Sequence, residues 1–158
     1  MNAVRRFFFY GTLLGGMDNP VAQAVHCRFR DLGPAWVPGR LFAISDRDGW
    51  YPALVTGEGV ANGRLYAALP GFGGGELAAL DAYEGCQAGP GWPGEYGRRA
   101  VFATMPSGRG SHAQAYLYRR PLPRRAVLIT GGDFPGWLRQ TGHAAFCRRV
   151  SGNRAIAS

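Results

Sequence analysis

Short apolar segments that end at glycine or proline dominate the hydrophobic pattern of this 158-residue chain. The first extends from Val4 to Tyr10, is rich in aromatic residues and stops at Gly11, which predicts a buried strand. Further segments have the length and composition of strands: residues 39–42, 49–55, 63–66, 100–105 and 113–118. The pattern therefore predicts about six strands joined by turns that contain glycine or proline.

Helical periodicity is clearest between Glu76 and Glu84. Apolar and acidic side chains there recur at spacings that place them on one helical face: Leu77, Leu80, Asp81 and Glu84. Gly85 follows, where the C-cap of a helix favours a residue able to take a positive φ. Weaker helical patterns cover residues 19–32, starting at an Asn-Pro pair, and residues 137–149.

Most of the predicted strands follow one another without an intervening helix, unlike the alternation of a doubly wound parallel sheet. This order favours a curved sheet or small barrel with helices packed against it. No linker divides the chain, so residues 1–150 are expected to form one domain. Residues 151–158 are expected to be a flexible tail that contains an arginine.

The composition of the chain indicates the cellular compartment in which we expect the protein. Hydrophobic residues make up 46% of the chain, yet no apolar run approaches the ~20 residues of a membrane-spanning helix. Arg5-Arg6 and the apolar run behind them lack the cleavage site of a secretory signal. Cys27, Cys86 and Cys147 are an odd number without close pairing, which suits a reducing compartment. We therefore expect a soluble cytoplasmic protein with no membrane partner, and nothing in the spacing proposes a metal site.

The positive charge is concentrated near the C-terminus. The net charge is +8, every basic residue is arginine, and residues 119–158 carry eight arginines against Asp133 alone. One interpretation is a solvated face with an Arg-bearing tail. The other is an anionic partner such as nucleic acid. The absence of any nucleic-acid-binding motif in the sequence disfavours the second.

Glu84 is the strongest candidate for chemistry. It ends the predicted helix on the face marked by Leu77 and Leu80, so its carboxyl is expected to point inward. Burial and the negative end of the helix dipole would both raise its pKa, as a proton shuttle near neutral pH requires. The alternative is an ordinary glutamate that extends from the helix end toward Arg98 or Arg99.

A second candidate is the turn Tyr10-Gly11-Thr12-Leu13, directly after the first strand. Glycine allows the backbone to turn sharply there and leaves successive N–H groups free to bind an anion such as a carboxylate. The alternative is a plain turn between strand and loop. Hydroxyl-bearing aromatic residues recur at strand positions, and some of them are expected to line a pocket: Tyr51, Tyr66, Tyr96, Tyr116 and Tyr118.

In this order, the motifs resemble the γ-glutamylcyclotransferase-like family, particularly its AIG2-like and γ-glutamylamine cyclotransferase branch. The similarity covers residues 8 to about 133. The matching pieces are Phe8-Phe9-Tyr10-Gly11-Thr12-Leu13, Gly39-Arg40-Leu41-Phe42, Tyr51-Pro52-Ala53-Leu54, Gly63-Arg64-Leu65-Tyr66, Leu80-Asp81-Ala82-Tyr83-Glu84-Gly85, Tyr96 with Arg98, Ala115-Tyr116-Leu117-Tyr118, and Gly132-Asp133.

The resemblance implies an α+β fold, a small mixed β-barrel with flanking helices, and a pocket for a γ-glutamyl group. It implies that the backbone amides of Gly11, Thr12 and Leu13, beside Tyr10, bind the α-carboxylate of the glutamyl group. It also implies that Glu84 is the catalytic acid and base. Tyrosines near the pocket in this family correspond to Tyr96 and Tyr118.

The implied reaction is the release of 5-oxoproline and a free amine from a γ-glutamyl amine or amide. The α-amine of the substrate attacks its own γ-carbonyl, so no cofactor is expected. Another interpretation is a non-catalytic binding or regulatory domain that uses the same pocket, because one fold hosts several activities. The connection from Cys86 to Glu95 is longer than in many relatives, which is expected to reshape the mouth of the pocket.

Overall fold

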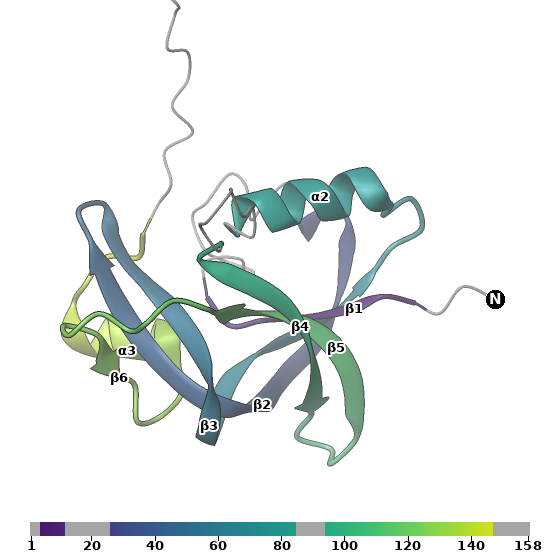
Figure 1. The fold of residues 1–158 in the computed structure, drawn as a ribbon. Coiled ribbons are helices and arrows are strands. Elements are labelled where there is room, and N and C mark those ends of the chain that lie inside the picture. The colour runs from purple at the N-terminus through teal and green to yellow at the C-terminus, as the bar shows by residue number, and fades with distance from the viewer. Residues whose placement is uncertain (1–3, 12–25, 85–93, 147–158) are drawn as a thin grey trace, which may run out of the picture.

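The described part of the chain forms a closed five-stranded barrel. The computed structural model describes residues 4–11, 26–84 and 94–146. The barrel strands are β1 (Arg6–Phe9), β2 (Phe29–Asp46), β3 (Gly49–Ala68), β4 (Tyr96–Thr104) and β5 (Gly110–Tyr118). They pair in the order β3-β1-β5-β4-β2, and β2 pairs with β3 to close the ring (Figure 1). A short strand, β6 (Val127–Leu128), adds to the outer side of β2.

The barrel is mixed because β1 and β5 run parallel, at the pairing of Phe7 with Gln114. The other pairings are antiparallel, and the hairpin of β2 with β3 forms the longest ladder. The expected α+β fold with a small mixed barrel and flanking helices is therefore confirmed.

The hairpin of β2 and β3 is longer and more continuous than the sequence pattern predicts. The segments expected as separate strands at residues 39–42, 49–55 and 63–66 are parts of these two strands. Gly33, Pro34, Pro38 and Gly39 lie within β2 at two shifts of its register against β3. Bulges of this kind bend a strand without ending it. The glycines and prolines that suggested breaks therefore mark bends in one strand.

Strand β1 is buried on both faces, which explains its unbroken aromatic run. Side chains alternate along a strand. Phe7 and Phe9 accordingly join a cluster that includes Phe29 and Tyr66, whereas Phe8 belongs to the barrel interior. All three phenylalanines are almost completely buried. A strand at the centre of two core clusters thus fixes where the chain emerges at Tyr10.

The described residues also form two helices, which lie on different sides of the barrel (Figure 1). Helix α2 (Gly74–Tyr83) covers the aromatic cluster through the buried Leu80, so the inward face expected for this helix is confirmed. Helix α3 (Phe134–Thr141) packs on the barrel interior through Phe134.

Two helical predictions are wrong in part. Residues 29–32 belong to β2, because their alternation serves the sheet once they pair with β3. Helix α3 ends at Gly142, which adopts the left-handed conformation with φ 72°, instead of continuing to residue 149. Residues 19–25 of the first predicted helix, the expected C-cap Gly85 and residues 147–149 lie outside the described residues.

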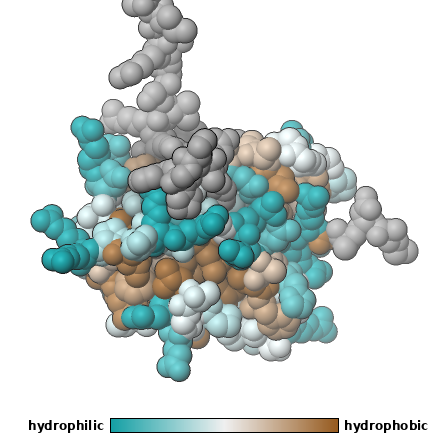
Figure 2. Space-filling model, in the orientation of Figure 1, coloured by the Kyte–Doolittle hydropathy of each residue, from teal (hydrophilic) through white to brown (hydrophobic). Residues whose placement is uncertain are grey.

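Exposed apolar side chains are spread over several elements instead of forming one face. Figure 2 shows hydrophobic residues as a band between hydrophilic ones on the side it presents. The large exposed ones are Val4, Val60, Leu69, Phe102, Val127 and Leu128. Scattered apolar exposure of this kind is ordinary for a folded domain. No helix among the described residues is long and apolar enough to cross a bilayer.

Candidate active site

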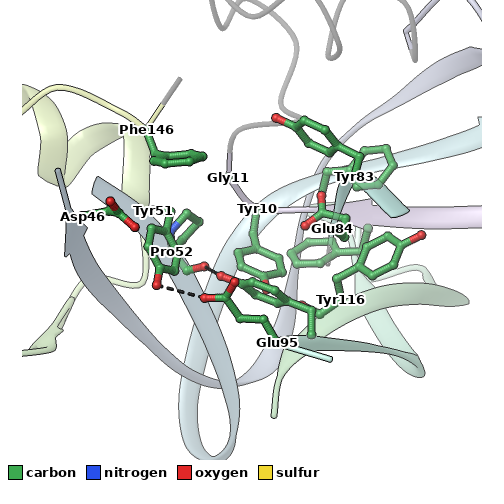
Figure 3. A pocket seen from close by; sticks show the side chains of 13 residues that line it. Tyr10, Gly11, Asp46, Tyr51, Pro52, Tyr83, Glu84, Glu95, Tyr116 and Phe146 are labelled. Carbon is green, nitrogen blue, oxygen red and sulfur yellow. Dashed lines mark hydrogen bonds between the residues drawn. The ribbon is translucent and has the colours of Figure 1, made fainter. Parts of the chain in front are cut away.

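A pocket of about 240 Å³ opens where the ends of several elements meet. The end of β1, the C-terminus of α2 and the starts of β3 and β4 contribute most of its wall (Figure 3). The described residues that line it are Phe8, Phe9, Tyr10, Gly11, Asp46, Tyr51, Pro52, Tyr83, Glu84, Glu95, Tyr96, Tyr116 and Phe146. Six of the residues singled out by sequence are thus brought together: Tyr10, Gly11, Tyr51, Glu84, Tyr96 and Tyr116.

The exit of β1 is held by a hydrogen bond and by close packing. The buried hydroxyl of Tyr10 donates to the backbone carbonyl of Tyr116 on β5. A Cβ at Gly11 would come within 2.3 Å of Pro52 Cγ on β3. Only glycine therefore allows the backbone to pass this close to β3. Thr12 and Leu13 lie outside the described residues.

Glu84 is the C-cap residue of α2, and its carboxyl lies against the pocket (Figure 3). Its backbone N–H donates to the Leu80 carbonyl at 3.1 Å, which completes the last turn. Burial, followed by the negative charge of Glu95, raises the pKa of Glu84 to about 8. The negative end of the helix dipole acts in the same direction. The carboxyl can consequently exchange a proton near neutral pH.

The structure does not support the alternative in which Glu84 extends toward Arg98 or Arg99. Arg98 instead donates to Asp81, with Nε 2.9 Å from Oδ1, and also to Gln114. The Tyr116 hydroxyl donates to the same Asp81 oxygen at 2.6 Å. Asp81 therefore ties α2 to β4 and β5 one turn before Glu84, and this fixes the end of the helix at the pocket.

Tyr96 and Tyr118 occupy different positions relative to the cavity. The Tyr96 hydroxyl donates to the Pro52 carbonyl at 2.7 Å. Burial and the neighbouring Tyr10 and Glu84 hold the pKa of Tyr96 well above its usual value, so its hydroxyl stays protonated. Tyr118 packs edge-on against Tyr96, with ring centroids 5.4 Å apart, and is not among the residues that line the pocket.

The structure adds Glu95, Asp46 and Phe146, which sequence reasoning did not single out. The Tyr51 hydroxyl donates to Glu95 Oε1 at 2.9 Å across the floor of the pocket (Figure 3). Asp46 ends β2 at the hairpin turn. No local pattern distinguished these residues. Glu95 closes a segment that was interpreted as a lengthened connection, and Asp46 lies in a turn.

Phe146 reaches the pocket through a strap of residues that follows α3. Trp50 N–H donates to the Ala144 carbonyl at 2.9 Å, and Phe146 N–H donates to the Trp50 carbonyl at 2.6 Å. The His143 ring stacks on Trp50 at 4.7 Å, which adds side-chain contact to the backbone pairing. Such long-range pairing leaves no periodicity in the sequence.

The described residues contain no cluster of three or more His, Cys, Asp or Glu side chains able to hold a metal ion. The lining of the pocket combines a carboxyl of raised pKa, the glycine that follows β1 and hydroxyl-bearing aromatic rings. A small molecule with groups that gain or lose protons fits this class of site.

Residues 7–139 match the family described as "Gamma-glutamyl cyclotransferase, AIG2-like". The chain belongs to this family, as the ordered motifs indicated. A search of curated protein sequences gave no significant match.

Solved structures with the same fold come from diverse sources. YkqA from Bacillus subtilis has 20% identity and a TM-score of 0.64; the match covers 89% of this chain and 43% of YkqA. An AIG2-like protein from Mus musculus has 20% identity and a TM-score of 0.60, over 77% of this chain and 82% of that one. A protein described as a gamma-glutamyl cyclotransferase has 15% identity and a TM-score of 0.58, over 96% and 93% of the two chains. The chain thus spans less than half the length of YkqA.

Proposed function

We propose that this protein is a γ-glutamyl cyclotransferase that converts a γ-glutamyl amine or amide into 5-oxoproline and a free amine. The observation that carries the proposal is Glu84, a carboxyl of raised pKa that faces the pocket beside Gly11. Membership of the cyclotransferase family supports the reaction type.

The substrate is proposed to bind with its α-carboxylate on the backbone N–H groups of Gly11, Thr12 and Leu13. Its α-amine and γ-carbonyl then lie on the side of the pocket where Glu84 ends α2. Tyr10 and Tyr96 hold this wall in place through their hydrogen bonds to Tyr116 and Pro52. Tyr118 is proposed to support Tyr96 through its edge-on ring contact.

The chemical step forms one carbon–nitrogen bond and breaks another. Glu84 takes a proton from the α-ammonium, and the free amine attacks the γ-carbonyl carbon to form the five-membered lactam. The bond from that carbon to the amide nitrogen then breaks, and Glu84 returns the proton to the departing nitrogen. Glu84, ionised again, takes the second proton that the new lactam nitrogen must lose and passes it to the released amine, which leaves as an ammonium. Nucleophile and electrophile belong to one molecule, so positioning supplies much of the rate and no cofactor is required. Proton transfer by Glu84 contributes about 10²–10⁴-fold.

The test compares the native protein with Glu84→Gln on a panel of γ-glutamyl amines and γ-glutamyl dipeptides, with 5-oxoproline detected by mass spectrometry. Glu84→Gln keeps the shape of the side chain and removes the proton shuttle, so turnover is expected to fall by at least about 10²-fold. Glu58→Gln, an exposed carboxyl of β3 away from the pocket, is the matched control and is expected to keep native turnover.

Near-native turnover by Glu84→Gln contradicts the mechanism. Binding of panel compounds without product by the folded native protein supports the other interpretation instead, a regulatory or binding domain with the same pocket. Circular dichroism of each variant separates a loss of chemistry from a loss of fold.

A further inference from the structure

The pocket has a strongly acidic lining. Three of the described residues that line it are carboxyls, Asp46, Glu84 and Glu95, whereas none of the described lining residues is an arginine or histidine. One carboxyl, Glu84, has the proposed role in proton transfer. The other two do not themselves transfer a proton in that reaction, although the charge of Glu95 helps to raise the pKa of Glu84, so their place in the wall calls for a further explanation.

Glu95 is held in a fixed position. The Tyr51 hydroxyl donates to its Oε1 at 2.9 Å, and the carboxyl is partly buried at the start of β4. Burial and the charge of Glu95 keep the pKa of Tyr51 above its ordinary value, so this hydroxyl remains a donor. The remaining acceptor capacity of the carboxylate is available to a ligand.

Aromatic rings complete this side of the cavity. Tyr51 and Phe146 meet edge to face with ring centroids 5.9 Å apart. In Figure 3 these two rings and Asp46 lie across the pocket from Glu84, and Glu95 lies between the two sides. Carboxylates next to aromatic faces attract an ammonium group through charge and through the ring quadrupole.

The orientation of the substrate assigns this side to the departing amine. The γ-glutamyl part occupies the side with Gly11 and Glu84, because its nitrogen atoms must reach that carboxyl. The substituent on the amide nitrogen is left with the side formed by Tyr51, Asp46 and Phe146. A substituent with its own carboxylate, as in a γ-glutamyl dipeptide, would meet like charge there.

We propose that Glu95, with Asp46 and the rings of Tyr51 and Phe146, binds a second ammonium group on the leaving amine, so that the preferred substrates are γ-glutamyl conjugates of diamines or polyamines. The inference rests on the proposed cyclotransferase function and specifies its substrate class. Glu95 is the main determinant because it is the carboxylate held in place by Tyr51. Asp46 is exposed at the rim and adds charge at longer range.

The experiment compares two synthetic substrates of similar length. One is γ-glutamyl-1,4-diaminobutane, whose free end is an ammonium group, and the other is γ-glutamyl-pentylamine, whose end is a methyl group. Both release 5-oxoproline through the same step, so the ratio of their kcat/KM values isolates recognition of the far end. We expect the native protein to favour the diamine conjugate by about ten-fold or more, as for a partly buried charge pair.

Variants then assign the preference to residues. Glu95→Gln is expected to reduce the ratio to about three-fold or less, and Asp46→Asn to reduce it by a smaller factor. Glu58→Gln removes an equal charge away from the pocket and is expected to leave the ratio unchanged. Higher salt is expected to lower the native ratio, because screening weakens attraction at the partly exposed carboxylates.

Failure of this inference differs from failure of the proposed function. Turnover of both conjugates at similar kcat/KM, or a preference that survives Glu95→Gln, overturns the subsite and leaves the cyclotransferase activity standing. Absence of 5-oxoproline from both conjugates and from the wider panel overturns the proposed function itself. A preference for γ-glutamyl dipeptides also overturns the subsite, because their carboxylate would have to bind beside Glu95.

Discussion

Among single residues, the raised pKa of Glu84 leads to a prediction about stability as well as about catalysis. Its pKa is about 8 in the folded protein, against an ordinary value near 4.5. The folded protein therefore retains a proton that the unfolded chain releases between these two pH values. The contribution of Glu84 to stability is complete below pH 4.5 and is lost as pH rises toward 8. Burial of this carboxyl at the pocket thus lowers the stability of the folded protein in alkaline solution.

Glu84→Gln should consequently be more stable than the native protein at pH 9. The neutral amide resembles the protonated carboxyl and does not ionise in a buried setting. The expected gain is about 2–4 kcal/mol in the free energy of unfolding, since one pKa unit corresponds to about 1.4 kcal/mol. Urea unfolding at pH 4.5 and pH 9 measures it. Glu58→Gln, at an exposed position, should change stability by less than about 0.5 kcal/mol. An equal effect of Glu84→Gln at both pH values would show that the carboxyl is solvated.

The pH dependence of catalysis gives a second prediction at this scale. Glu84 must be ionised to accept the first proton, so kcat/KM should rise with pH through its pKa of about 8. The charge of Glu95 is one cause of that raised pKa, after burial. Glu95→Gln should therefore move the rising limb to lower pH.

The rising limb of kcat/KM is measured with γ-glutamyl-pentylamine, because this substrate has no second ammonium group for Glu95 to bind. The ammonium of the substrate titrates identically for both proteins, so a difference between them belongs to the enzyme. If the rising limb of kcat/KM stays in place in Glu95→Gln, or moves to higher pH, the charge of Glu95 does not raise the pKa of Glu84.

Among the elements, α2 has the clearest link between packing and chemistry. Its docking relies on Asp81, which accepts hydrogen bonds from Arg98 and from the Tyr116 hydroxyl. The side chains of Asp81 and Arg98 are 27% and 30% exposed, so solvent compensates poorly for a lost partner. Asp81→Asn should cost about 1–3 kcal/mol of stability and lower kcat more than it raises KM, because the end of α2 would then hold Glu84 less firmly.

The matched control is Asp31→Asn on β2. Asp31 pairs with Arg64 at 3.0 Å, but the two side chains are 45% and 39% exposed and lie away from the pocket. Pairs of this kind contribute about 0–1 kcal/mol. Chemical denaturation and steady-state kinetics on both variants test the difference. Equal effects of the two substitutions would remove the proposed positioning role of Asp81.

The sequence predicted those helices and strands whose pattern of apolar residues is contained within a short stretch of the chain. The helix through Leu80 was predictable because its inward side chains follow a helical period, and the strand through Phe8 because it is a short aromatic run that stops at glycine. The continuity of β2 was not, since Gly33 and Pro38 have the composition of turns and act as bulges only when paired with β3. The end of α3 was missed because Gly142 acts as a C-cap before the apolar pattern stops.

The residues of the candidate site also fall into two groups, those that local sequence patterns predicted and those that only the completed fold reveals. Glu84 and Gly11 were recognisable because they lie at the ends of elements with a local pattern, the helical period of α2 and the aromatic run of β1. Glu95 and Phe146 were not, because they reach the pocket through the Tyr51 hydroxyl and the backbone of Trp50, far away in the sequence. The side of the pocket proposed to bind the leaving amine is therefore the side that depends most on the completed fold.

At the scale of the whole molecule, closure of the barrel is what assembles the site. Gly11 follows β1, Glu84 ends α2, and Tyr51 and Glu95 lie at the starts of β3 and β4. These positions converge only when β1 is inserted between β3 and β5. Stability of the barrel and integrity of the pocket should therefore be lost together.

Gly63→Ala tests this coupling at the junction of β1 and β3. A Cβ at Gly63 would lie 2.2 Å from the Phe9 carbonyl oxygen and 2.7 Å from the Phe8 ring. Neither the backbone of β1 nor a fully buried ring can yield cheaply, so the two strands must separate. We expect a loss of about 1–3 kcal/mol in the free energy of unfolding, as for an overpacked core. Release of 5-oxoproline should fall as well, because Tyr10 and Gly11 shift with β1.

Gly75→Ala is the control. Nothing lies within 4 Å of the added methyl group, which should stabilise α2 by about 0.5–1 kcal/mol and leave turnover unchanged. Full activity in a destabilised Gly63→Ala protein would mean that the pocket assembles independently of barrel closure.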